Sequence, residues 1–271
     1  TTCYSHSIRT WSLVAFIIIV LFSCQQESQP EESPLEVSSG RVERLENFPS
    51  ELVPPRTIDI WLPEGYSSEN NYSVLYMHDG QMLYDSSTTW NGQEWQIDEV
   101  VGELISQDKI EEVIVVGIYN GGADRHAEYF PQKPFESLEE NVQDSLFNLG
   151  RSNDQPLFAS DLRADAYLEF LVKELKPYID ENFSTNPDAS RTFVACSSMG
   201  GLISMYAICE YPQVFGGAAC LSTHWVGTFE VKNNPIPAAF VNYVAENLPE
   251  PRQNKIYFDY GTETLDALYE P

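Results

Sequence analysis

Short apolar runs alternate along the chain with segments whose apolar residues recur every three or four positions. The runs are apolar or β-branched over most of their length, as is typical of strands covered on both faces. They lie at 57–62, 72–77, 113–118, 192–195, 217–221 and 256–259, and the periodic segments lie near 95–105, 167–179 and 202–208. Strands that alternate with helices predict a mostly parallel, doubly wound α/β sheet. The first strands, joined by short turns, are expected to form an antiparallel edge.

The stretch from 120 to 162 shows little periodicity, and we interpret it as an insertion or lid over a functional site. Neither a repeat nor a second linker is visible in the remaining sequence, so residues 41–271 are predicted to form one domain.

The first forty residues have a different character. Residues 13–22 read LVAFIIIVLF and follow Arg9, which is typical of the apolar core of a secretion signal. Cys24 comes directly afterwards, in a setting that resembles a bacterial lipoprotein cleavage site. We therefore expect a lipoprotein signal peptide at 1–23, lipidation of Cys24, a flexible tether at 24–40 and a location in the bacterial cell envelope. An ordinary signal peptide with a chance cysteine is the alternative.

The charge balance limits the possible partners. The chain holds 41 acidic and 15 basic residues, with a formal net charge of −26, which disfavours binding to nucleic acid. The five cysteines match neither a zinc site nor a small disulfide framework. The sequence shows no glycine-rich phosphate loop and no constellation of metal ligands, so we predict no cofactor and no metal.

One motif carries the chemistry. Residues 192–201 read TFVACSSMGG, in which an apolar strand runs into a small-residue turn and then into a helical pattern. This is the context of a nucleophile elbow, where a tight turn lifts a serine hydroxyl clear of the sheet. In the pattern G-x-S-x-G the serine is Ser198, and Cys196 replaces the first glycine. The alternative is a small-residue turn with an inert serine.

At this point the chain resembles a family of α/β hydrolases. The family includes S-formylglutathione hydrolase, feruloyl and acetylxylan esterases, enterochelin esterases and mycolyltransferases. The resemblance covers roughly 57–271 and rests on IDIWLPEGY (58–66), VLYMHDGQMLYD (74–85), ACSSMGGLISMYA (195–207) and FGGAACLSTHW (215–225). The HDGQ segment and the run DRHAEYFP at 124–131 are most similar to the siderophore-esterase branch. The resemblance implies the α/β-hydrolase fold.

The resemblance also implies roles for individual residues. Ser198 would form an acyl-enzyme, and the backbone N–H groups of Met199 and Gln81 would hold the oxyanion. The acid is expected a few residues after Gly261, at Asp266 or alternatively at Glu263. Residues expected to touch substrate are His78, Asp79, Arg125, His224 and Trp225, although for His78 and Asp79 support of the loop is the favoured alternative, and for Arg125 an ordinary surface ion pair is equally compatible.

The catalytic histidine is not evident. The fold orders its triad as serine, acid and histidine, and no histidine follows Glu263. We therefore expect a chain cut short at its C-terminus, as the missing initiator methionine suggests for the N-terminus. His224 would fill the role only by breaking the chain order.

The preferred function is a serine carboxylic-ester hydrolase acting on a small-molecule or carbohydrate ester, of siderophore or acylated-carbohydrate type. The alternatives are an acyltransferase of the mycolyltransferase type and a non-catalytic binding lipoprotein.

Overall fold

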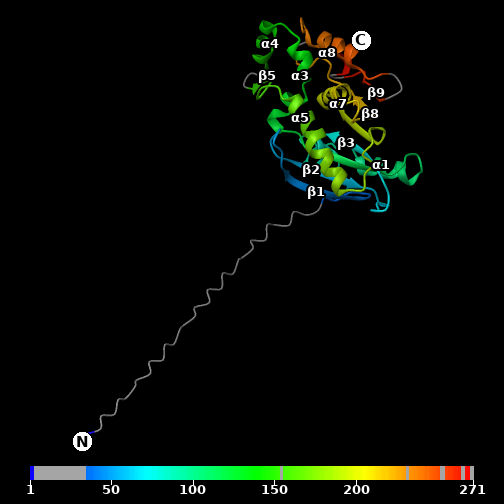
Figure 1. Cartoon of the computed structure of the whole chain (residues 1–271). Helices are drawn as coiled ribbons and strands as arrows, with labels where there is room; N and C mark the ends of the chain where they lie inside the picture. Colours follow the sequence, from blue (N-terminus) through cyan, green and yellow to red (C-terminus); the bar gives the residue numbers. More distant parts are fainter. Residues whose placement is uncertain (3–34, 153–154, 230–231, 251–253, 264–265, 269–271) are drawn as a thin grey trace. The chain divides into compact units, whose positions relative to one another are not determined.

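The computed structural model describes residues 1–2, 35–152, 155–229, 232–250, 254–263 and 266–268. Cys24 and residues 3–23 of the expected signal peptide lie outside the described residues. From Leu35 onward the described residues build a seven-stranded sheet with helices on its two faces (Figure 1). The strands are β1 (Arg41–Phe48), β2 (Arg56–Leu62), β3 (Ser73–His78), β4 (Val113–Ile118), β7 (Thr192–Ser197), β8 (Gly217–Leu221) and β9 (Lys255–Phe258).

The strands lie in the order β1-β2-β4-β3-β7-β8-β9. Neighbouring strands from β4 through β9 run parallel, whereas β1 pairs antiparallel with β2, and β2 pairs antiparallel with β4. This confirms the mostly parallel sheet with an antiparallel edge. Strand β1 is an addition to the prediction. Its sequence RVERLENF is mostly charged or polar and lies exposed at the sheet edge, so it lacks the apolar run that marks the other strands.

The helices follow the expected pattern for the longest elements. They are α1 (Ile97–Ser106), α2 (Arg125–Tyr129), α3 (Gln132–Glu136), α4 (Glu140–Phe147), α5 (Ala164–Phe170), α6 (Lys176–Asn182), α7 (Met199–Glu210) and α8 (Ile236–Asn247). A π-helical turn at Leu171–Leu175 joins α5 to α6, so the two form one continuous helical segment. Short 3-10 turns lie at Gly80–Met82, Ser86–Thr88, Gly122–Asp124, Ala189–Arg191 and Asp266–Leu268. None of the described helices is long and apolar enough to cross a lipid bilayer.

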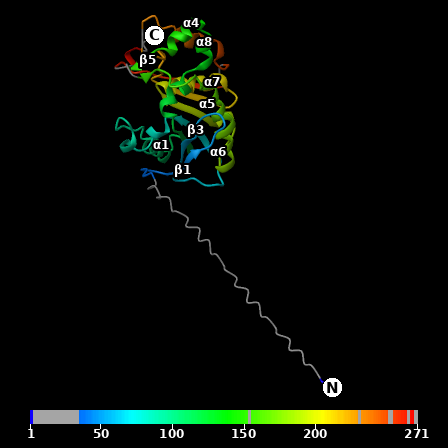
Figure 2. The same ribbon diagram turned by 90° about the vertical axis from the view of Figure 1, so that its left-hand side faces the viewer.

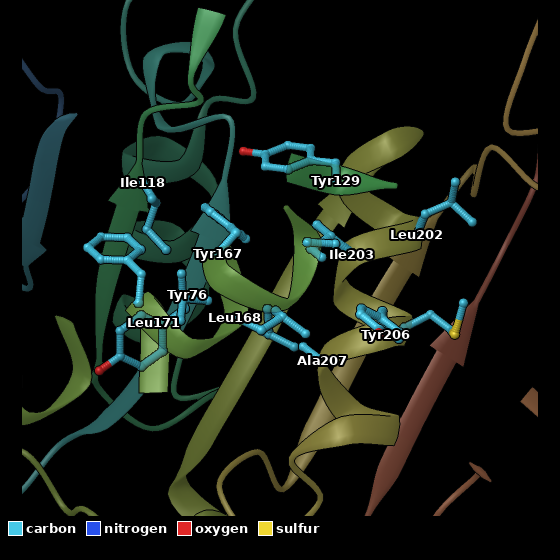
Figure 3. Close-up of a cluster of buried hydrophobic side chains, with 14 of the residues drawn as sticks. Tyr76, Ile118, Tyr129, Tyr167, Leu168, Leu171, Leu202, Ile203, Tyr206 and Ala207 are labelled. Atoms are coloured by element: carbon cyan, nitrogen blue, oxygen red, sulfur yellow. The ribbon is translucent and has the colours of Figure 1, made fainter. Parts of the chain in front are cut away.

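The two faces of the sheet are covered differently. Helices α5, α6 and α7 pack on one face, and α1 packs on the other (Figure 2). Figure 3 shows part of the larger core, where strand, α5 and α7 side chains gather into one layer. The labelled members are Tyr76, Ile118, Tyr129, Tyr167, Leu168, Leu171, Leu202, Ile203, Tyr206 and Ala207. Every residue of α7 from Met199 to Cys209 is buried, so the helix is apolar on all sides rather than amphipathic.

The stretch interpreted as an insertion or lid contains three short helices and the small hairpin of β5 (Gly150–Ser152) and β6 (Gln155–Pro156). It contributes directly to the main core, because Tyr129, Phe130 and Phe135 are at most 2% exposed. These aromatic anchors tie the base of the segment to the sheet and to α7, and so fix where α2 stands beside the sheet.

The compact domain starts before Arg41. Leu35 and Val37 pack against the α1 side of the sheet, and Ser38 donates from its backbone and its hydroxyl to the buried carboxylate of Asp98. Residues 35–40, which fall in the range expected to be a tether, are therefore packed against the domain.

Candidate active site

Ser198 stands between β7 and α7 with an unusual backbone. Its φ of 57° and ψ of −123° lie where an L-residue pays a steric cost, and it directly precedes the first residue of α7. Two hydrogen bonds hold the turn, because Ser198 N–H donates to Leu221 O at 2.9 Å and His224 N–H donates to Ser198 O at 3.2 Å. The side chain is partly exposed. This geometry is that of a strained strand-to-helix turn which presents a hydroxyl at the carboxyl edge of the sheet.

The turn needs small residues because two backbone segments meet there. A Cβ on Gly200 would lie 2.3 Å from Cys196 Sγ and 2.6 Å from Cys196 Cβ. Since no side chain fits at position 200, the glycine is required by the close approach of the first turn of α7 to β7. Cys196 itself is 1% exposed and fills the space beneath the turn.

The loop after β3 is the second strained segment at this edge. Asp79 has φ 56° and ψ 43°, in the left-handed region. Gly80 follows, and a Cβ on it would lie 2.5 Å from the carbonyl carbon of Gly117 in β4. The loop is thus pressed onto the neighbouring strand, which fixes the direction of the backbone at Gln81. Asn120 N–H donates to Gln81 Oε1 at 3.3 Å and ties the Gln81 side chain to the end of β4.

Asp79 is the most heavily bonded side chain of the site. Arg125 Nε and Nη2 each donate to its carboxylate at 2.6 Å, and Asn120 Nδ2 donates to Oδ1 at 2.7 Å. Burial alone would raise the pKa of Asp79, but the hydrogen bonds and charge of Arg125, with the bond from Asn120, bring it below its ordinary value. The group is therefore a buried carboxylate that is fully engaged inside the protein.

His78 lies beneath the same loop and is fully buried. Its Nδ1 is 2.7 Å from the hydroxyl of Tyr167, and the ring packs between Tyr129 and Tyr167. Burial lowers the pKa of His78 to about 3, so the imidazole is neutral at physiological pH. For both His78 and Asp79 the structure favours the loop-supporting role over direct contact with substrate.

Arg125 joins the site to the segment that follows β4. Its guanidinium uses Nε and Nη2 for Asp79, and none of the described residues accepts a hydrogen bond from Nη1. The side chain is 31% exposed, against 10% for Asp79. It also stacks on the Tyr129 ring, with 5.1 Å from Cζ to the ring centroid. The cation is thus held in place from two sides and still reaches solvent.

Asp266 and Glu263, the two candidates for the acid, differ in their surroundings. Asp266 Oδ2 accepts hydrogen bonds from Ser222 Oγ and from Gly261 N–H, both at 2.8 Å, so its side chain crosses from the end of β9 to the loop after β8. Glu263 is exposed. The structure places Asp266 at the same carboxyl edge as Ser198, and its catalytic role stays a prediction.

His224 and Trp225 follow β8 at this edge. His224 is 5% exposed, and burial lowers its pKa to about 4, against a hydrogen bond with the Thr228 backbone that raises it. Trp225 is half-buried and packs on Phe258, with ring centroids 5.7 Å apart. Among the described residues, no group of three His, Cys, Asp or Glu side chains is placed to hold a metal ion.

The expected oxyanion donors belong to the two segments that contact Cys196, which are the first turn of α7 and the loop after β3. Met199 opens α7, where free N–H groups and the helix dipole favour a negative charge. Gln81 lies in the turn after Asp79. The sequence pattern did not indicate a role at this site for Asn120 or Tyr167, whereas Tyr129 was expected either at the site or as a packed tyrosine. Asn120 follows a parallel strand at its carboxyl end, which is the position where polar residues often contribute to a site and the signal that could have identified it.

Known proteins share both the sequence pattern and the fold. The family profile described as "Putative esterase" matches residues 50–268. The uncharacterized protein YbbA of Bacillus subtilis (strain 168) is 26% identical over 172 residues, which cover 63% of this chain and 58% of YbbA. The chain thus spans little more than half the length of that relative.

Two solved structures show the same fold. An IroE-like serine hydrolase from Shewanella oneidensis aligns with a TM-score of 0.54 and 20% identity, over 84% of this chain and 78% of that one. The enterobactin esterase FES from Shigella flexneri aligns with a TM-score of 0.53 and 15% identity, over 82% of this chain and 46% of that one. The architecture is therefore that of the α/β-hydrolase esterases, as the sequence predicts.

Proposed function

Because the chain belongs to this esterase family, we propose that it is a serine carboxylic-ester hydrolase that works through an acyl-enzyme on Ser198. The observation that carries the proposal is the backbone of Ser198, with φ 57° and ψ −123° at the head of a buried helix. Strain of this kind persists only where the surrounding structure enforces it, and it clusters at functional positions.

In the proposed reaction Ser198 Oγ attacks the ester carbonyl carbon, and its proton passes to a general base. The carbonyl oxygen becomes an oxyanion that accepts hydrogen bonds from the N–H groups of Met199 and Gln81. Collapse of the intermediate releases the alcohol, which takes the proton, and water then hydrolyses the acyl-enzyme. We assign the acid to Asp266. No histidine follows Asp266 in the sequence, so His224 is the candidate base among the histidines present, although it precedes the acid in the chain.

The proposed substrate is an ester of siderophore type, whose aromatic acid carries hydroxyl groups. Arg125 supports this choice, because a fixed and partly exposed guanidinium beside the oxyanion loop suits an acidic oxygen substituent. The similarity to an enterobactin esterase is compatible with it. Acylated carbohydrates are the second substrate class to assay, and Trp225 is the residue that would stack on a sugar.

Labelling with a fluorophosphonate tests the nucleophile. We expect the wild-type chain to be labelled at one site and Ser198→Ala to lose the label completely, since only an activated serine reacts. Ser197→Ala is the matched control, because it removes the neighbouring hydroxyl at the end of β7 and should keep the label. Labelling that persists in Ser198→Ala, or a wild-type chain that never labels, would refute the proposal. Loss of labelling in His224→Ala would assign the base to His224.

Product analysis separates hydrolysis from acyl transfer. With an activated aryl ester and an added alcohol, a hydrolase yields mainly free acid, whereas a transferase yields mainly the new ester. Dominance of the new ester would move the assignment to an acyltransferase. A non-catalytic binding protein would give neither product while retaining affinity for the ester.

We also propose attachment to the bacterial cell envelope through lipid on Cys24, which would place the site outside the cytoplasm. The proposal rests on the sequence around Cys24. Expression with radiolabelled palmitate should give a labelled protein in the membrane fraction, and Cys24→Ser should give an unlabelled one. Equal labelling of both forms would contradict lipidation at this position.

A further inference from the structure

Cys196 occupies the position where the nucleophile motif has its first glycine, and its thiol contacts another loop of the site. Cys196 Sγ is 3.3 Å from His78 O and 3.5 Å from Asp79 Oδ2. The donor belongs to β7, whereas both acceptors belong to the segment that carries the chain from β3 toward Gln81. One thiol proton therefore lies between two oxygens of the neighbouring loop.

The same sulfur also supports the nucleophile turn. Position 200 can hold only glycine because a Cβ there would lie 2.3 Å from Cys196 Sγ and 3.4 Å from Asp79 Oδ2. The first turn of α7, the thiol and the Asp79 carboxylate are thus in mutual contact. A glycine at position 196 would leave a gap between the two segments and no donor to join them.

The protonation states make this contact a directed hydrogen bond. Burial raises the pKa of the Cys196 thiol well above its ordinary value, and the charge of Asp79 raises it further. The pKa of Asp79 is lowered by Arg125 and Asn120 despite burial. At neutral pH the sulfur keeps its proton and the carboxylate has none, so the thiol donates and a charged group accepts.

From these contacts we propose that Cys196 is a positioning residue that sets the spacing between the two oxyanion donors, the N–H groups of Met199 and Gln81. This inference rests on the proposed esterase function. Met199 belongs to the turn that packs on the sulfur, and Gln81 comes two residues after the carboxylate that accepts from it. The thiol links the two halves of the proposed oxyanion hole.

The kinetic test compares Cys196→Ala with Cys196→Ser. The alanine variant loses the donor, and we expect the maximal rate constant of fluorophosphonate labelling to fall about tenfold, with less than about a twofold change in the half-saturating concentration. The serine variant keeps a donor, and we expect its rate to return to within about threefold of wild type. An alanine variant as fast as wild type, or a serine variant as slow as alanine, overturns the proposal.

Cys220→Ala is the matched control. Cys220 is the residue of β8 in register with Cys196 and is equally buried, and within the described part of the chain its thiol donates no hydrogen bond to the loop after β3. Removal of its thiol should lower stability about as much as removal of the Cys196 thiol, without slowing the labelling. If both variants label equally slowly, the effect is general loosening of the sheet, and the positioning role is wrong.

The S–H stretching band in the infrared spectrum tests the hydrogen bond without any need for activity. The Cys196 band is identified by its loss in Cys196→Ser and is expected at lower frequency than the Cys220 band. Asp79→Asn replaces a charged acceptor by a neutral one and should move the Cys196 band upward. An unmoved band overturns the thiol–carboxylate link. A wild-type chain with the expected band but no labelling would instead refute the esterase function and the oxyanion role built on it.

Discussion

The short helix α2 takes part in two ion pairs, contributing the cation to one and the anion to the other. The two helix residues are three positions apart in the sequence. Its cation, Arg125, reaches Asp79 at the sheet edge, and its anion, Glu128, reaches Arg56 in the core with hydrogen bonds of 2.9 and 2.7 Å. The Arg125 side chain is 31% exposed, whereas those of Arg56 and Glu128 are 3% and 0% exposed. The two pairs share bidentate geometry and differ in their access to water.

This difference separates the roles of the two pairs. A fully buried pair gains little net free energy, because desolvation offsets attraction, but removal of one partner strands a charge. Arg56 is held further by the rings of Tyr167 and Phe170, which lie 5.4 and 5.3 Å from its Cζ. The core pair therefore fixes where α2 packs, and the edge pair uses that fixed helix to present a guanidinium beside the loop after β3.

The largest effect is expected from breaking the core pair. Glu128→Ala leaves the Arg56 guanidinium buried without its anion, and we expect the free energy of unfolding to fall by about 3–5 kcal/mol. Urea denaturation measures it. The control is Glu169→Ala, which breaks the exposed Glu169–Lys173 pair and should cost about 0.5 kcal/mol or less. Similar losses in both variants would show that burial does not distinguish the pairs.

An intermediate effect is expected from acid, because His78 is buried as a neutral imidazole. Its folded pKa is about 3, below the unfolded value of about 6.5, so its stabilising contribution is complete above pH 6.5 and falls as the unfolded chain takes up a proton. The slope approaches about 1.4 kcal/mol per pH unit below pH 6.5, and the loss is about 2 kcal/mol between pH 6.5 and 4.5.

His78→Asn should reduce the slope of unfolding free energy against pH by up to about 1.4 kcal/mol per pH unit between pH 6.5 and 4.5. His126 and His224, with pKa values lowered by burial to about 3 and about 4, remain in the variant and keep their own share of the slope. The lowered pKa of Asp79 affects a different pH range, because the stability that the Asp79 carboxylate contributes is lost only as the pH falls below about 4. An unchanged slope would mean that His78 is accessible to protons in the folded state.

The smallest effect on stability is expected at the edge pair. Arg125→Ala leaves Asp79 with donors from Asn120 and Cys196 and with nearby water, so we expect a loss of about 1–2 kcal/mol in unfolding free energy. Its effect on catalysis should be selective. The kcat/KM for an ester with an acidic ring substituent should fall about tenfold more than that for the neutral analogue.

Arg125→Lys tests the geometry of the same pair, since it keeps the charge and loses the fork that matches the Asp79 carboxylate. It should recover part of the stability and little of the discrimination between acidic and neutral esters. Equal losses on both esters in Arg125→Ala would assign Arg125 to support of the loop alone.

The sequence predicts the parts of this molecule that rest on local patterns. The apolar runs locate six strands to within one or two residues. Five of them are largely buried, as apolar strands covered on both faces are, whereas β9 lies at the sheet edge and is mostly exposed. The turn around Ser198 is also predictable, since the small residues it requires are adjacent in the chain. Helices α2 and α3 have five residues each, too few to show a period, and their aromatic residues indicate the core only after folding.

Local patterns cannot predict which side chains bind each other across the site when they are distant in the sequence. Asp79 and Arg125 are 46 residues apart, and the sequence leaves each open between contact with substrate and a structural role. Only the fold shows that they bind each other. Likewise, the sequence shows only that Cys196 replaces the first glycine of the motif. The structure shows what the cysteine does there, because its thiol donates to Asp79, which is 117 residues away in the sequence.

The charged edge strand β1 has a consequence for the behaviour of the protein in solution. An edge strand offers unpaired N–H and C=O groups to any extended chain nearby, and its own side chains decide whether that chain can approach. Arg41, Glu43, Arg44 and Glu46 line β1 within eight residues. A second strand would have to bring its backbone against this dense row of ions, so this border of the sheet resists aggregation by strand addition.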